Sequence, residues 1–133
     1  NAFWDISQYI DSLDLEVLVY KNCHEHVDRI VQLCQKTNQF NISTKRYTET
    51  EINIFLNLQE KYTIYTFAVK DKYGEYGIAG LAIISFIDLN TAFLDTWLMS
   101  CRVMGRNIEY AFFDYIVKKL EEQNDLLIQN NVK

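Results

Sequence analysis

The chain has 133 residues, with 13 Lys and Arg against 18 Asp and Glu, and a formal net charge of −5. This length suits a single domain, and the apolar and charged fractions, 49% and 23%, are those of a folded globular protein rather than a disordered one. The acidic balance argues against a general nucleic-acid binder, and no apolar run reaches the length of a membrane-spanning helix. We therefore expect neither nucleic acid nor membrane among the partners.

The cysteines indicate the cellular compartment. They stand at positions 23, 34 and 101, and no two of them form a Cys-x-x-Cys pair. An odd number without pairing argues against a disulfide framework and a structural zinc site, so we expect a cytoplasmic protein without a metal. The chain begins with Asn-Ala, which we interpret as the remnant of a cleaved tag. Residues 3–133 are expected to form one domain taken from a longer protein.

The spacing of apolar residues predicts the elements of the first half. Residues 3–13 have helical periodicity, residues 15–20 form a β-rich run, and residues 26–36 carry one apolar helical face. Thr48 and Glu51 form a capping box, which opens a further helix. The order predicted here is helix, strand, helix, helix.

The second half predicts a strand meander followed by a long helix. Residues 62–70, 78–87 and 92–100 have strand character, and turn-like residues separate them. Residues 107–123 form the clearest amphipathic helix, and Leu126-Leu127-Ile128 would start a last strand. We therefore expect an α/β fold (α+β in some schemes), with a mixed, mostly antiparallel sheet flanked by helices and ending after its fifth strand.

The run Cys23-His24-Glu25-His26 resembles a set of metal ligands in composition. Residues two apart on a helix do not face each other, and no second ligand cluster appears elsewhere in the sequence. We therefore interpret this run as a solvated helix start.

The segment between the last meander strand and the long helix predicts an anion site. A strand that leads through a glycine-containing loop into a helix start presents free backbone N–H groups and the positive end of the helix dipole. Two arginines would add charge-assisted hydrogen bonds to a phosphate. The alternative is an ordinary tight turn with two solvated arginines. The residues of this predicted site are Arg102, Val103, Met104, Gly105, Arg106 and Asn107.

Two residues beside this segment are candidates for catalysis. Asp95 lies in an apolar strand, where burial would raise the pKa of its carboxyl and make it a general base. The alternative is a structural ion pair with Arg102 or Arg106. Cys101 stands beside the two arginines before a helix start, an environment that favours the thiolate and a nucleophilic role. The alternative is an inert buried cysteine.

A polar loop between two predicted helices offers a second candidate region. It contains three amide side chains, which need hydrogen-bond partners if they are buried. They would either line a substrate pocket or satisfy the local backbone and cap a helix end. The residues of this loop are Thr37, Asn38, Gln39, Phe40 and Asn41.

The motif Arg102-x-x-Gly105-x-Asn107 resembles the Gln/Arg-x-x-Gly-x-Gly/Ala loop of the GNAT (N-acetyltransferase) fold. In that fold a strand, two helices, a three-strand meander, the loop, a helix and a further strand follow in this order. The resemblance implies that the loop cradles the pyrophosphate of coenzyme A or the phosphopantetheine of a carrier protein. Asn107 departs from the usual Gly or Ala, although Asn tolerates left-handed backbone angles.

Five blocks at consistent spacing resemble the C-terminal region of FkbH-like proteins. They are residues 36–41, 44–48, 71–77, 95–96 and 98–106. That family joins a phosphatase-like domain of the haloacid-dehalogenase (HAD) type to a GNAT-like domain. Its members load a glyceryl unit from a bisphosphoglycerate, as a thioester, on an acyl carrier protein.

The FkbH resemblance implies acyl or glyceryl transfer on a pantetheine thiol. Residues 37–41, Asp95 and Thr96 would then line the acyl end, and the acyl carrier protein and the HAD domain of the same protein would be the partners. The chain has no DxDx(T/V) motif of that HAD domain, and it ends before the last strands of a full GNAT fold. Whether the domain is an enzyme stays open. It could instead be a non-catalytic domain that docks the carrier protein, or a purely structural appendage.

Overall fold

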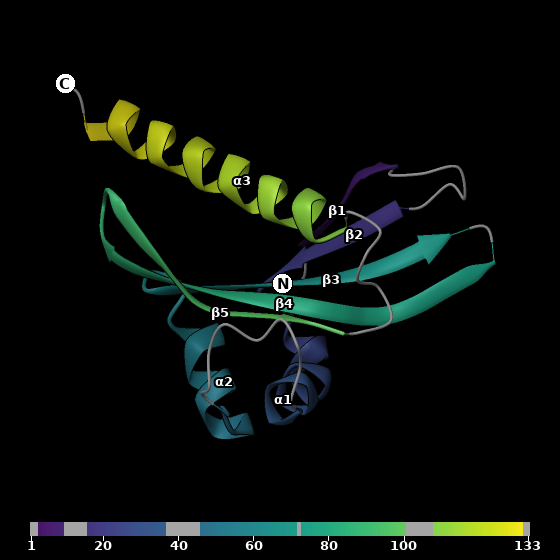
Figure 1. The fold of residues 1–133 in the computed structure, drawn as a ribbon. Helices are drawn as coiled ribbons and strands as arrows, with labels where there is room; N and C mark the ends of the chain where they lie inside the picture. Colours follow the sequence, from purple (N-terminus) through teal and green to yellow (C-terminus); the bar gives the residue numbers. More distant parts are fainter. Residues whose placement is uncertain (1–2, 10–15, 37–45, 72, 101–107, 132–133) are drawn as a thin grey trace.

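A five-stranded sheet runs through the molecule in a computed structural model, with helices on both of its faces (Figure 1). The structure describes residues 3–9, 16–36, 46–71, 73–100 and 108–131. The elements in chain order are β1 (Phe3–Tyr9), β2 (Glu16–Lys21), the 3₁₀ turn η1 (His24–His26), α1 (Val27–Gln35), α2 (Glu49–Asn57), β3 (Tyr62–Asp71), β4 (Gly74–Asp88), β5 (Thr91–Met99) and α3 (Ile108–Asn131).

The strand order is β1-β2-β3-β4-β5, and the pairing between each two neighbours is antiparallel. Strands that follow one another in the chain are therefore also neighbours in the sheet, and α1 and α2 are inserted between β2 and β3. The expectation of an α/β fold with a mostly antiparallel sheet is confirmed. The expected mixed sheet is not seen, because the strands that the structure describes contain no parallel pair.

Two predicted elements are wrong. Residues 3–9, predicted as part of a helix, form β1, whose Phe3 pairs with Lys21 and whose Ile6 pairs with Leu18. Pairing with a neighbouring strand overrode the local helical spacing there. The strand predicted at 126–128 lies instead within α3, which continues to Asn131. No Gly or Pro interrupts the chain from 108 to 131, so nothing in that sequence ends the helix earlier.

The helices divide the core into two parts, because α1 and α2 cover one face of the sheet and α3 crosses the other (Figure 1). The alternation of β3 supplies both parts: Phe67 and its neighbours two residues away face α3, whereas Ile64 faces α1 and α2. We call the two parts the α3-side core and the α1–α2-side core. The buried residues of the α3-side core are Val17, Val19, Tyr65, Phe67, Val69, Ala79, Ala82, Ile84, Met99, Phe112 and Ile116. Those of the α1–α2-side core are Val27, Ile30, Leu33, Cys34, Tyr47, Ile52, Leu56, Ile64, Leu81, Ile83 and Leu98.

Three glycines serve the β3–β4 hairpin and the close packing of β4. Gly74 and Gly77 have φ of +141° and +73°, which other residues rarely adopt. Gly80 instead allows a close approach, because a Cβ atom there would overlap Cε1 of Phe67 and lie 2.7 Å from the carbonyl oxygen of Leu98. Among the described helices, none is both long enough and apolar enough to cross a membrane.

Candidate functional site

Most of the predicted site residues lie outside the residues that the structure describes. This holds for the polar loop 37–41, for Cys101 and for the predicted anion site 102–107. Asp95 and Thr96 are described, and both lie on β5. The site is therefore built from these two residues and from the side chains that meet them.

A β-bulge on β5 places Asp95 and Thr96. Ile83 of β4 pairs with Thr96 and the next residue, Ile84, pairs with Leu94, so Asp95 is an extra residue on β5. A bulge of this kind changes the direction of the side chain it carries, and bulges are frequent beside functional sites. Leu94 packs against the α3-side core, whereas Asp95 accepts a hydrogen bond from Tyr47 of the α1–α2-side core. The hydroxyl of the fully buried Thr96 donates to Oδ2 of Asp95 at 2.8 Å.

Tyr47 is the partner of Asp95 that the sequence did not predict. Its hydroxyl donates to Oδ2 of Asp95 at 2.6 Å, and its ring packs edge-on against Phe55 of α2 at 4.9 Å between centroids. Gln35 at the end of α1 donates its side-chain amide to the carbonyl oxygen of Tyr47 at 2.9 Å, and Arg46 donates to the carbonyl oxygen of Gln35 at 2.8 Å. Contacts with both α1 and α2 thus fix the position of Tyr47, whose hydroxyl contacts β5 of the sheet.

Burial and charge set the protonation of this group. Burial raises the pKa of Tyr47, and the hydrogen bond to the Asp95 carboxylate raises it further, so the phenol remains a donor. Burial also raises the pKa of Cys34 to about 11, with a further contribution from the charge of Asp95 and an opposing one from a backbone hydrogen bond with Tyr47. Cys34 is therefore a protonated core thiol at neutral pH and no nucleophile. Asp95 itself accepts two hydroxyl hydrogen bonds on one oxygen, Oδ2, from Tyr47 and Thr96.

The arrangement can present a fixed negative charge, or a proton acceptor, near one edge of the sheet. Asp95 is half-buried, and β5, which carries it, is the last strand of the five in the sheet order. The hydroxyls of Tyr47 and Thr96 fix the orientation of its carboxylate, which is what a general base or an ion-pairing group requires. The alternative ion pair with Arg102 or Arg106 involves residues outside the described part.

Sequence signals could have found only part of this site. The bulge at Asp95 has no local signature, and the partners Tyr47 and Asp95 are 48 positions apart. Tyr47 directly precedes the predicted capping box, in which Thr48 and Glu51 exchange both hydrogen bonds as expected. That box fixes where the helix begins, and so where Tyr47 lies, but not what its hydroxyl meets.

The Cys23–His26 run is only partly the solvated helix start that we predicted. His24 and Glu25 are exposed, but Cys23 is buried and His26 is half-buried. Nδ1 of His26 and Oγ1 of Thr66 are 2.9 Å apart in a hydrogen bond, and the ring meets Tyr20 edge-on at 4.6 Å. Within the described ranges, no three His, Cys, Asp or Glu side chains gather as metal ligands would. His26 thus packs against Tyr20 of β2 and Thr66 of β3.

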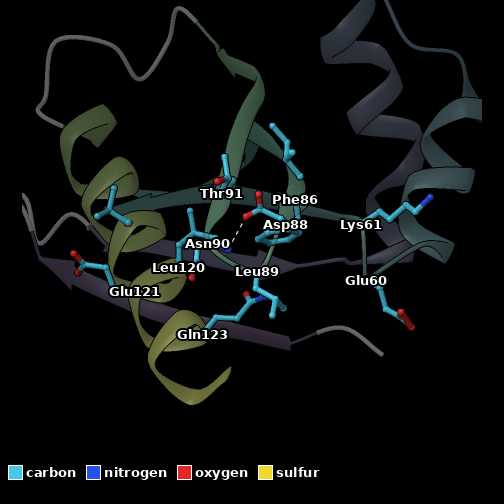
Figure 2. A pocket seen from close by; sticks show the side chains of 13 residues that line it. Glu60, Lys61, Phe86, Asp88, Leu89, Asn90, Thr91, Leu120, Glu121 and Gln123 are labelled. Carbon is cyan, nitrogen blue, oxygen red and sulfur yellow. Dashed lines mark hydrogen bonds between the residues drawn. The ribbon is translucent and has the colours of Figure 1, made fainter. Parts of the chain in front are cut away.

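A cavity of 670 Å³ lies elsewhere, between the β4–β5 hairpin, the α2–β3 turn and α3 (Figure 2). None of the residues singled out from the sequence lines it. We call it the hairpin pocket. Its lining residues are Glu60, Lys61, Phe86, Ile87, Asp88, Leu89, Asn90, Thr91, Ala92, Val117, Leu120, Glu121 and Gln123.

Comparison of the chain with protein-family models, with curated proteins and with solved structures finds no match in any of the three.

Proposed function

We propose that this chain is the GNAT-like, acyltransferase-type domain of an FkbH-like protein. It would help to load a glyceryl or related acyl unit onto an acyl carrier protein through a pantetheine thioester. The observation that carries the proposal is the order of elements: α1 and α2 follow β2, and the antiparallel meander of β3, β4 and β5 follows them. The motif Arg102-x-x-Gly105-x-Asn107 then stands between the end of β5 at Met99 and the start of α3 at Ile108.

The proposed roles rest on the motif and on the resemblance to FkbH-like proteins. Coenzyme A, or the phosphopantetheine of the carrier protein, supplies the thiol that carries the acyl group. Backbone N–H groups of residues 102–107 hold its phosphate, with added charge from Arg102 and Arg106. Asp95, fixed by the hydroxyls of Tyr47 and Thr96, is the proposed proton acceptor. Cys101 is the proposed acyl carrier on the protein, and residues 37–41 line the acyl end.

Trp97 provides a reporter for the test. Its ring stacks on Phe112 with centroids 5.1 Å apart and meets Phe113 edge-on at 5.9 Å, so it contacts the first turns of α3, directly after the proposed loop. A Trp4→Phe variant leaves Trp97 as the single tryptophan of the chain. We would titrate this variant with coenzyme A, with holo acyl carrier protein and with apo acyl carrier protein, and follow its fluorescence.

The outcome of this titration distinguishes a transferase-type domain from a carrier-docking domain. Binding that requires the pantetheine arm supports the transferase-type cleft. Equal binding of apo and holo carrier protein assigns the domain to carrier docking instead, and no binding of any of the three ligands overturns both. Arg102→Ala with Arg106→Ala should weaken binding about tenfold or more, because two charged hydrogen bonds are lost. Lys21→Ala with Lys70→Ala is the matched control, since it removes two exposed positive charges from β2 and β3.

A further inference from the structure

The hairpin pocket has an apolar interior built from two separate elements. The β4–β5 hairpin contributes Phe86, Leu89 and Ala92, and α3 contributes Val117 and Leu120. Its 670 Å³ fall within the range of about 300–1,000 Å³ that is typical of sites for small ligands. A site of this size has room for large apolar side chains of a bound segment.

The apolar lining of the pocket is partly open to solvent at the hairpin. Ile87 and Leu89, which line the pocket, are 65% and 61% exposed. Single exposed apolar residues are common, but a group of them that lines a pocket marks an interaction surface. In Figure 1 this hairpin extends from the sheet beneath the C-terminal half of α3. Because these apolar side chains are exposed at the hairpin, the pocket suits a protein segment better than an enclosed small ligand.

The charges around the pocket select the partner. Glu60, Asp88 and Glu121 line it, against one lysine, Lys61. Oδ1 of Asp88 accepts a hydrogen bond from the backbone N–H of Asn90 at 2.8 Å, which fixes this carboxylate at the hairpin turn. Figure 2 shows Glu121 and Glu60 on opposite sides of the pocket, with the Lys61 side chain pointing away from Asp88. The rim is therefore acidic, and it favours a cationic partner.

We propose that the hairpin pocket docks a basic, apolar segment of a partner protein. A large apolar side chain of that segment packs among Phe86, Leu89 and Leu120, and flanking Lys or Arg side chains pair with Glu60, Asp88 or Glu121. Carrier proteins are generally acidic and would be repelled by this rim, so the pocket serves a different partner. The inference therefore stands whether or not the proposed acyl transfer is correct.

The direct test is an NMR titration of the isotope-labelled chain with two short peptides, one of alternating Leu and Lys and one of alternating Leu and Glu. We expect amide shifts confined to residues 60–61, 86–92 and 117–123, and binding of the Lys peptide at least about tenfold tighter than that of the Glu peptide. Shifts spread over the whole surface, or equal binding of the two peptides, would overturn the proposal. Concentration-dependent shifts of the same residues without peptide would assign the surface to a second copy of the chain and overturn it as well.

Variants separate the charge from the apolar contact. Glu60→Lys with Glu121→Lys should weaken binding of the Lys peptide and strengthen binding of the Glu peptide, because the net charge of the rim changes from negative to positive. Leu89→Ser should weaken the binding of both peptides about fivefold or more, because an apolar contact is lost. These side chains are largely exposed, so the fold is expected to persist. The control is Glu25→Lys, at an exposed position of the η1 turn beside α1. If this control changed peptide binding as much as the rim variants do, the proposal would be overturned.

Discussion

Tyr47 donates its hydroxyl hydrogen to Oδ2 of Asp95 at 2.6 Å and so joins the segment before α2 to the bulge on β5. The acceptor is a carboxylate and the donor ring is buried, which makes this a charge-assisted bond in a largely dry setting. The bond therefore couples the position of α2 to that of the last strand of the sheet.

Tyr47→Phe removes this bond and leaves the ring in place. We expect a loss of about 1.5–3 kcal/mol in the free energy of unfolding, the range for a hydrogen bond to a charged group. Urea unfolding followed by circular dichroism measures it. The control is Tyr110→Phe, which changes an exposed phenol of α3 and should cost less than about 0.5 kcal/mol. Equal costs for the two variants would mean that the bond to Asp95 contributes nothing to stability.

The buried tyrosines predict a loss of stability in alkali. Burial raises the pKa of Tyr47, and it raises the pKa of Tyr65 to about 12, with a smaller contribution from Tyr115. Above pH 10, the ordinary value, the unfolded chain loses phenol protons that the folded chain keeps, so the free energy of unfolding should fall as the pH rises. Tyr65→Phe should reduce this slope, as measured by urea unfolding at a series of alkaline pH values. An unchanged slope in this variant would contradict the prediction.

His26 predicts the opposite dependence in acid. Burial lowers its pKa below the ordinary 6.5, and the charge of Glu25 opposes this only in part. Below pH 6.5 the unfolded chain binds a proton that the folded chain resists, so stability should fall as the pH drops from 6.5 toward the lower, folded pKa. His26→Asn, which can keep a hydrogen bond to Thr66, should flatten this part of the curve. An unchanged curve in His26→Asn would contradict the prediction.

How far the sequence predicts this structure depends on the range of the interactions involved. The helix at Thr48 and the three meander strands were predicted because capping residues, turn residues and strand composition are local signals. Residues 3–9 were assigned to the wrong element because their helical spacing is also local, whereas their pairing with β2 is not. Where the local pattern is compatible with more than one structure, contacts between elements therefore determine which one forms.

The candidate site was also predicted only as far as local sequence signals reach. Asp95 was singled out because a carboxylate in an apolar strand is conspicuous in the sequence, and Thr96 because of the resemblance to FkbH-like proteins. The extra residue on β5 that turns Asp95 toward Tyr47 depends on the register between β4 and β5, which no short motif specifies. The hairpin pocket was missed for a similar reason: its walls come from elements that are adjacent only after folding.

Gly80 provides the sharpest test of the packing on the α3 side. A Cβ atom there would overlap the ring of Phe67, which itself lies 4.2 Å from Phe112 between centroids, and would lie 2.7 Å from the backbone oxygen of Leu98. Gly80→Ala should therefore cost about 3 kcal/mol in urea unfolding, the upper end of what overpacking usually costs. Gly77→Ala is the matched control, because it meets open space and bears only the strain of φ +73°, about 1 kcal/mol. Combining Gly80→Ala with Phe67→Leu should cost less than the sum of the two single changes, since the smaller side chain relieves the overlap. Strict additivity would show that the ring of Phe67 does not require glycine at position 80.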